Sequence, residues 1–127
     1  MGMGTLRFGT VGAARGHKAF GRLAVAQGGK RVALPVCVLH GARPGPHVVI
    51  LANQHGTELN GMESLRRFCA SADPRRLRGT VFAVLSCNPR AAAAGEPVWT
   101  EGDPDAEAAY HGPYNMNYNW PGRTGGK

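Results

Sequence analysis

The fold is decided by residues 47–70, which read HVVILANQHGTELNGMESLRRFCA and change their hydrophobic spacing half-way along. Four apolar residues follow one another at 48–51, as in a strand covered on both faces inside an α/β sheet. From Leu59 onward the apolar residues recur at intervals of three and four, which predicts an amphipathic helix over residues 58–70. The stretch therefore predicts a buried strand over 47–52, a short junction and a helix.

A second apolar run, at residues 80–86, follows this helix. A strand, a helix and a further strand make a βαβ unit, whose two strands are expected to be parallel. The carboxyl ends of parallel strands lie at one edge of the sheet, where ligands bind in open α/β folds. That edge would bring His55 and Glu58 close to the Cys87-Asn88-Pro89 segment.

The sequence outside this βαβ unit predicts further antiparallel strands before it and a tail after it. Strands are expected at 5–10, 20–25 and 31–40, and the Pro-Gly turn within 41–46 predicts an antiparallel hairpin with the strand 47–52. Residues 90–127 lack periodicity and read as a long loop or tail. The predicted fold class is α/β, with a mixed sheet that contains one βαβ unit.

The chain carries 15 lysines and arginines against eight acidic residues, which raises the question of nucleic-acid binding. Residues 1–95 hold 13 of the basic and three of the acidic residues, whereas residues 96–127 are net acidic. Alanine, glycine, proline and arginine make up 58 of the 127 residues, so the arginines belong to a broad compositional bias. Neither zinc-finger spacing nor interleaved aromatic residues accompany the basic ones. Nucleic acid is therefore disfavoured as the principal partner.

The length, the cysteines and the hydropathy predict one cytoplasmic domain without a membrane segment. No stretch approaches the roughly 18 consecutive apolar residues of a membrane helix, and the N-terminus lacks the apolar core of a secretory signal. Cys37, Cys69 and Cys87 lie in apolar segments without CxxC spacing, so they are expected to be reduced core residues.

The sharpest chemical feature is the pair His55 and Glu58, three residues apart at the junction between strand and helix. Imidazole and carboxylate groups are both zinc ligands, and Gly56 allows the backbone between them to bend. The spacing alone is weak, because a His-Glu pair at a helix start is more often a hydrogen bond than a metal site. Its place at the carboxyl end of a strand favours a metal site.

Several spaced blocks resemble the succinylglutamate desuccinylase/aspartoacylase family of zinc carboxypeptidase-like hydrolases. In sequence order these blocks are Leu34-Pro35-Val36, the turn 41–46, His55-Gly-Thr-Glu-Leu-Asn-Gly61, Leu77-Arg-Gly79, Asn88-Pro89 with Ala91, and Asn115-Met-Asn-Tyr-Asn-Trp-Pro-Gly122. The resemblance implies part of a zinc-carboxypeptidase-like (phosphorylase/hydrolase-like) fold. It also implies a zinc-dependent hydrolase that cleaves amide, or less often ester, bonds of N-acyl amino acids or similar small molecules.

By the same resemblance, His55 and Glu58 are two zinc ligands, and Asn117 matches an asparagine that grips a substrate carboxylate. The family has an arginine at the next position, where this chain has Tyr118. A tyrosine donates one hydrogen bond in place of a bidentate fork, so Arg90 or Arg123 would have to supply a charge to the substrate.

In the family, the third zinc ligand and the glutamate that acts as general base lie downstream of the Pro-Gly step at 121–122. His111 is a candidate replacement ligand, although a solvated loop histidine is the more common case. The expectation is that residues 1–127 are the N-terminal part of a catalytic domain, inactive in isolation, with no catalytic base assigned in it. The alternatives are a complete but noncatalytic basic binding module and a degenerate family member without metal. An incomplete sheet is also expected to expose an edge through which the chain self-associates.

Overall fold

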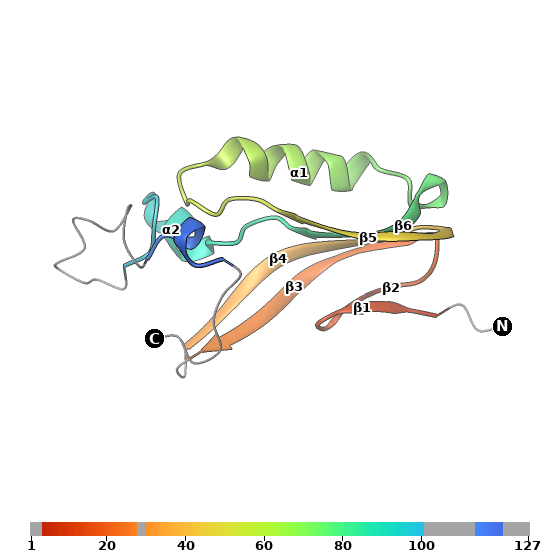
Figure 1. Ribbon diagram of the computed structural model, residues 1–127, viewed down its shortest axis with the longest axis horizontal. Helices are drawn as coiled ribbons and strands as arrows, with labels where there is room; N and C mark the ends of the chain where they lie inside the picture. The colour runs from red at the N-terminus through yellow and green to blue at the C-terminus, as the bar shows by residue number, and fades with distance from the viewer. Residues whose placement is uncertain (1–3, 28–29, 101–113, 121–127) are drawn as a thin grey trace.

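The computed structural model describes residues 4–27, 30–100 and 114–120. Its main feature is a four-stranded sheet with strand order β3-β4-β6-β5, beside a two-stranded sheet formed by β1 and β2. Helix α1 lies over one face of the larger sheet, and the β1–β2 hairpin lies against the opposite face (Figure 1). The predicted α/β class with a mixed sheet is therefore confirmed.

The elements lie close to their predicted positions, with additions at both ends of the chain. In chain order they are β1 (Leu6–Phe8), β2 (Val11–Ala13), β3 (His17–Gln27), β4 (Lys30–His40), β5 (Arg43–Leu51), α1 (Leu59–Ser71), a 3-10 helix (Pro74–Arg76), β6 (Arg78–Val84), α2 (Pro89–Ala94) and a second 3-10 helix (Met116–Tyr118). Strand β2 was not predicted, and α2 lies in the segment expected to be a loop. None of the described helices is long and apolar enough to cross a membrane.

The βαβ unit forms as the change of hydrophobic spacing predicted. Strands β5 and β6 are parallel, with Val48 opposite Val81 and Leu51 opposite Val84. Helix α1 connects them and packs Leu65 and Cys69 on the sheet. The carboxyl ends of the two strands therefore meet at one edge, as expected.

The predicted antiparallel hairpin between β4 and β5 is wrong, because β6 lies between these two strands. Pro44 and Pro46 lack the N–H groups that a tight hairpin ladder needs. The chain instead runs alongside the start of β6 at close range, and a Cβ atom on Gly79, which has φ +81°, would overlap the carbonyl oxygen of Pro46. A register irregularity between Arg43 and His47 lies at this close approach.

The prediction that residues 48–51 are covered on both faces is also wrong. Strand β5 is the last strand at one edge of the described sheet, and the side chains of Val48 and Val49 are 45% and 60% exposed. An apolar run of four residues specifies a strand but does not specify how many layers cover it.

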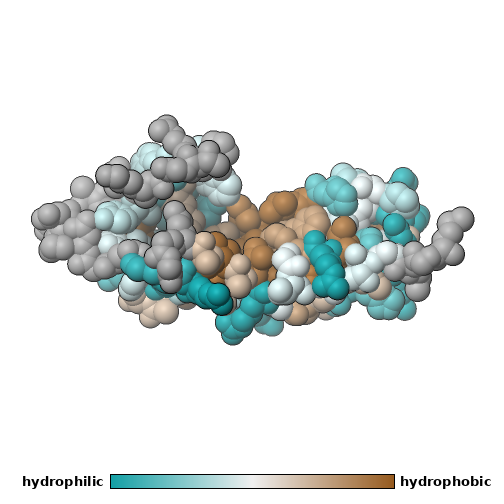
Figure 2. Space-filling view, turned by 90° about the horizontal axis from the view of Figure 1, so that it is seen from below, coloured by the Kyte–Doolittle hydropathy of each residue, from teal (hydrophilic) through white to brown (hydrophobic). Residues whose placement is uncertain are grey.

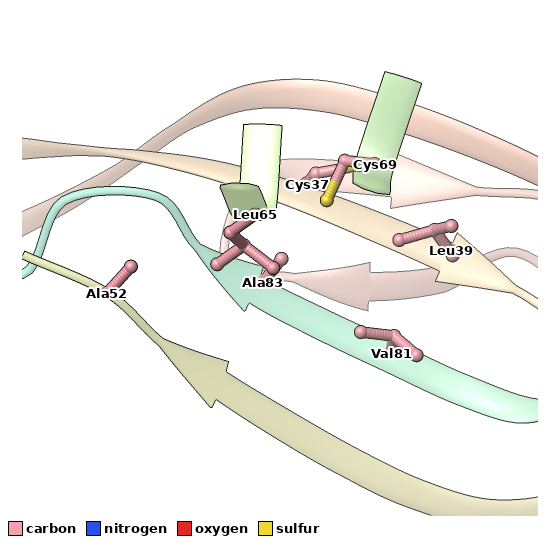
Figure 3. Packing of buried hydrophobic residues seen from close by; sticks show 7 residues of the cluster. All are labelled: Cys37, Leu39, Ala52, Leu65, Cys69, Val81 and Ala83. Atoms are coloured by element: carbon pink, nitrogen blue, oxygen red, sulfur yellow. The ribbon is translucent and has the colours of Figure 1, made fainter. Parts of the chain in front are cut away.

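The core consists of two clusters, one on each face of the sheet. Under α1 the buried residues are Cys37, Leu39, Ala52, Leu65, Cys69, Val81 and Ala83 (Figure 3). On the other face, Val36, Val38 and Val84 pack against Val11 and Ala13 of the small hairpin. Cys37 and Cys69 are free thiols within the first cluster, where burial raises the pKa of Cys37 to about 12. Both behave as small core residues, as predicted.

Lys18 of β3 caps the end of α1 from across the sheet. Its Nζ donates to the carbonyl oxygens of Cys69, Ala70 and Ala72 at 2.8, 2.6 and 2.9 Å. The last carbonyl groups of a helix have no partner within the helix, and an ammonium group also complements the negative end of the helix dipole. Lys18 therefore ties the edge strand β3 to α1.

Candidate metal centre

The candidate site lies where the chain leaves the carboxyl ends of β5 and β6. Beyond the last strand pair the two segments stay hydrogen-bonded, from the N–H of Cys87 to the carbonyl of Ala52 at 2.9 Å and from the N–H of Asn88 to the carbonyl of Asn53 at 3.1 Å. The predicted meeting of the two segments is therefore observed. It provides a fixed base for the loop that carries His55.

Asn53 folds that loop. This buried residue has φ 56°, a left-handed conformation that asparagine tolerates better than most residues. Its Nδ2 donates to the carbonyl oxygens of His55 at 2.9 Å and Gly56 at 3.1 Å, while its Oδ1 accepts the hydroxyl of Ser86 at 2.7 Å. One side chain thus closes the turn and attaches it to the segment after β6.

Gly56 is required because the loop passes against α2. A Cβ atom at this position would overlap the backbone of Ala91 and Ala92 and the carbonyl oxygen of Glu96. The Gly56 N–H donates to the carbonyl of Pro97 at 3.0 Å. The flanking residues His55 and Glu58 are thereby held in a fixed relative position.

His55 and Glu58 face one another across this turn. Nδ1 of His55 lies 2.9 Å from Oε1 of Glu58. The histidine side chain is 5% exposed and the glutamate side chain 62% exposed, so the pair joins a buried ring to an accessible carboxylate. The prediction that these two groups converge agrees with this geometry.

The other ring nitrogen of His55 is held by Asn115, which lies 60 residues further along the chain. Nε2 is 3.0 Å from Oδ1 of Asn115, whose side chain is almost fully buried. The same Oδ1 accepts the backbone N–H of Asn117 at 2.9 Å, which identifies it as the oxygen of the amide. Nε2 therefore carries a proton and donates it, and Nδ1 is the nitrogen directed at Glu58.

These contacts raise the pKa of His55 above its ordinary value. The hydrogen bond to Glu58 is the largest cause and the bond to Asn115 the second, whereas burial acts in the opposite direction. Both ring nitrogens point at oxygen acceptors, which stabilises the protonated ring relative to a free imidazole. A cation binding at Nδ1 would compete with a proton there.

The two donors fit part of a zinc site. Tetrahedral zinc with ligands at about 2.0 to 2.1 Å places neighbouring ligand atoms roughly 3.3 Å apart, a few tenths of an ångström more than the observed separation. A metal-bound histidine usually donates its second ring N–H to an oxygen acceptor, as His55 does to Asn115. Within residues 4–27, 30–100 and 114–120, no third histidine, cysteine or carboxylate completes a metal-binding group. His111 lies outside the described residues.

Asn117 and Tyr118, predicted to contact substrate, lie on the 3-10 helix Met116–Tyr118, for which Asn115 is the N-cap. Both side chains are exposed, Tyr118 by 63%. Sequence reasoning singled out Asn117 and missed Asn115, whose side chain reaches His55. The available signal was an asparagine preceding a short helical turn, a position where its side chain commonly caps. Arg123 lies outside the described residues.

Among the described residues, side chains at this edge of the sheet line two cavities. One, of about 340 Å³, lies between the end of β5 and α1 and is lined by residues that include Asn53, Glu58 and Leu65. The other, of about 420 Å³, is lined by residues that include Arg90, Trp99 and Met116. A carboxylate group thus lines the first cavity, and a guanidinium group and an indole group line the second.

The family model of the succinylglutamate desuccinylase/aspartoacylase catalytic domain matches residues 44–126, well over half of the chain. The chain belongs to this family. The desuccinylase/aspartoacylase match spans β5, the His55 loop, α1 and the Asn115 segment, and so covers every group described above. It supports a hydrolase-like function for a partial domain.

Several solved structures share the fold. An aspartoacylase family protein from Mesorhizobium loti is 28% identical, with a TM-score of 0.66 over 87% of this chain and 32% of that one. The product-bound ectoine utilization protein EutE (DoeB) from Ruegeria pomeroyi is 23% identical, with a TM-score of 0.62 over 87% and 31%. A succinylglutamate desuccinylase from Silicibacter sp. TM1040 is 20% identical, with a TM-score of 0.63 over 95% and 36%.

This family member therefore spans about a third of the length of these structures. No curated protein matches its sequence at a significant level.

Proposed function

We propose that this chain forms part of a zinc-dependent hydrolase that cleaves the amide bond, or less often an ester bond, of N-acyl amino acids or similar small molecules. The observation that carries the proposal is the convergence of His55 Nδ1 and the Glu58 carboxylate at the carboxyl edge of the sheet. Membership of a family of desuccinylases and aspartoacylases supports the class of reaction.

His55 and Glu58 would be two of the metal ligands. When bound, zinc supplies Lewis-acid activation of the scissile carbonyl group and of water. Asn115 keeps the proton of the His55 ring on Nε2, which leaves the Nδ1 lone pair for the cation. Glu58 brings a negative charge from the accessible side, which lowers the cost of holding a divalent ion beside a buried ring.

Asn117 and Tyr118 would orient the substrate. Asn115 is the N-cap of their short helix and contacts His55, and this connection supports a role for both side chains near the proposed metal centre. A tyrosine hydroxyl donates one hydrogen bond, in contrast to the fork of an arginine, and this favours substrates whose polar group needs only one donor there. Arg90, which lines the larger neighbouring cavity, is the proposed source of positive charge for a substrate carboxylate.

The chain as it stands is expected to hydrolyse N-acyl amino acids at a negligible rate. A catalytic zinc normally has three protein ligands and a general base, and the described residues supply two ligands. Turnover of N-acetyl-aspartate or N-succinyl-glutamate by the purified chain that stops on addition of a chelator would contradict this expectation.

Zinc binding tests the metal centre itself. Calorimetric titration of the purified chain with Zn²⁺ should show one weak site that is lost in Glu58→Gln and in His55→Ala. The matched control is Glu63→Gln, which removes a carboxylate from the exposed face of α1 and should leave the zinc affinity unchanged. Equal and negligible zinc binding by the wild type and Glu58→Gln would reject the proposal in favour of a family member without metal.

A further inference from the structure

A basic cavity lies at the opposite end of the sheet from His55 and Glu58. It has a volume of about 170 Å³, and the polar side chains that line it belong to Arg15, His40, Arg43, His47 and Thr80. Among the described residues no carboxylate lines it, and the ionisable side chains that do are those of arginine and histidine. The space-filling view from the side of the β1–β2 hairpin shows an apolar area in the middle of the molecule, with hydrophilic residues toward the right-hand end (Figure 2).

The floor of the cavity is a row of side chains across three neighbouring strands. Thr80 of β6 is directly opposite His40 of β4 and His47 of β5 in the strand register. Directly opposed residues point to the same face of a sheet, so the hydroxyl group lies between two imidazoles. This is the face that carries the β1–β2 hairpin, because Val38 and Val84, at alternate positions along the same strands, pack against Val11.

Two polar atoms of this row are available to a ligand. His40 is 8% exposed, and its Nδ1 donates to the carbonyl oxygen of Ala13 at 3.1 Å, which leaves Nε2 for the cavity. Thr80 is 2% exposed, its hydroxyl has no hydrogen-bond partner among the described residues, and it is not sealed from solvent. A buried hydroxyl that opens on a cavity without a protein partner is suited to a bound polar group.

The two arginines are held at the cavity by the backbone. Arg15 lies in a turn in which the Gly16 N–H donates to the carbonyl of His40 at 2.8 Å. Arg43 begins β5 directly after Ala42, whose N–H donates to the carbonyl of Pro74 at 3.0 Å. Among the described residues no carboxylate lies within ion-pair distance of either guanidinium, whereas neighbouring Arg75 is paired with Asp73 at 2.9 Å.

We infer that this cavity binds a phosphate group, either as free inorganic phosphate or as the monoester group of a small molecule. Two guanidinium groups supply charge-assisted hydrogen bonds, which phosphate oxygens accept in pairs. The Thr80 hydroxyl donates a further bond, and His40 Nε2 shares one proton with the ligand. Donors from the turn before β3 and from β4, β5 and β6 approach a tetrahedral anion from several directions. This site does not depend on the proposed zinc chemistry.

Titration of the full 127-residue chain, followed by ¹⁵N chemical shifts, tests the inference with inorganic phosphate, methyl phosphate, acetate and a single-stranded oligonucleotide in separate experiments. Saturable binding of inorganic phosphate or methyl phosphate, with shifts at residues 40, 47 and 80, is expected. The stronger of the two ligands identifies the source of the phosphate group. Equal affinity for acetate would overturn the assignment to a tetrahedral dianion.

Three variants locate the site. Arg43→Gln should weaken phosphate binding by about tenfold or more, and the nearly isosteric Thr80→Val should weaken it by a few-fold while the protein remains folded. Arg22→Gln removes the same charge from an exposed position on β3 that does not line the cavity, and should change the affinity by less than about twofold.

Three outcomes would overturn the inference. They are the absence of saturable phosphate binding, equal losses in Arg43→Gln and Arg22→Gln, and oligonucleotide binding that is tighter than phosphate binding and insensitive to Thr80→Val. The last two results would indicate a diffuse basic surface in place of a built site.

Discussion

Asn115 fixes the orientation of His55, since its amide oxygen accepts both the ring Nε2–H and the backbone N–H of Asn117. In Asn115→Leu both donors lose their acceptor in a buried place, so we expect the free energy of unfolding to fall by about 1–3 kcal/mol. Urea denaturation followed by circular dichroism measures this change. The control Asn117→Leu keeps the backbone N–H and changes an exposed side chain, so its effect should stay below about 0.5 kcal/mol. Equal losses in the two variants would contradict this role.

Among the described residues, Glu63 is the carboxyl group whose pKa is lowered most by its neighbours. Hydrogen bonds from Arg66 and Arg67 lower the pKa of Glu63 from 4.5 to about 2. A lowered pKa in the folded state means that this contribution to stability is complete above pH 4.5 and is lost as the pH falls toward 2. A ¹³C titration of the side-chain carboxyl should give the low value directly. The double variant Arg66→Gln/Arg67→Gln should return it toward 4.5, and an unchanged midpoint would exclude the arginines as the cause.

The sequence predicted only the part of the site whose residues lie close together along the chain. His55 and Glu58 are three positions apart at a junction of two elements, so their meeting follows from the change of hydrophobic spacing. Asn115 reaches His55 across 60 residues. No periodic pattern connects these two segments, because the contact depends on how the chain returns after α2.

The same substitution, glycine to alanine, can be compared at Gly56 in the His55 loop and at Gly61 in α1. In Gly56→Ala the new Cβ would overlap the backbone of α2, and we expect a loss of about 3 kcal/mol or more in unfolding free energy. Gly61 lies in α1 with no atom within 4 Å of an added Cβ, so Gly61→Ala should stabilise the protein by about 0.5 to 1 kcal/mol. Thermal unfolding compares the two variants. A tolerated Gly56→Ala would mean that α2 does not restrict the His55 loop.

The spacing of apolar residues predicted individual helices and strands, but it did not predict the order of the strands in the sheet. The spacing of apolar residues specified α1, β5 and β6 because it reflects which side of each element is buried. It could not specify that β6 enters between β4 and β5. That order depends on Gly79, Pro44 and Pro46, whose effects on close approach and hydrogen bonding are not hydrophobic signals.

At the scale of the whole molecule, β5 leaves an apolar edge on the described sheet. Between Val48 and Leu51 it carries no charged residue, whereas the opposite edge strand β3 carries Lys18 and Arg22. Charged side chains on an edge strand oppose pairing with another chain. The β5 edge is therefore the surface through which we expect copies of this chain to associate.

Sedimentation velocity over a range of protein concentrations tests this expectation. Val49 is 60% exposed, and Val49→Lys should shift the chain toward the monomer. Val25→Lys places the same charge at a 43% exposed position on β3 and should leave the association unchanged. A wild-type chain that stays monomeric at all concentrations, or equal effects of the two variants, would exclude β5 as the contact.

The position of β6 between β4 and β5 affects how the sheet forms during synthesis on the ribosome. Strands β4 and β5 emerge first, but each needs β6 as its neighbour, so neither can complete its ladder until residues 78–84 have left the exit tunnel. During that interval the nascent chain presents Val36 and Val38 to solvent without Val84, which belongs to the same core cluster in the finished sheet. Sheet assembly is thus a late event in translation, and nascent chains stalled before β6 should be preferred clients of a ribosome-associated chaperone.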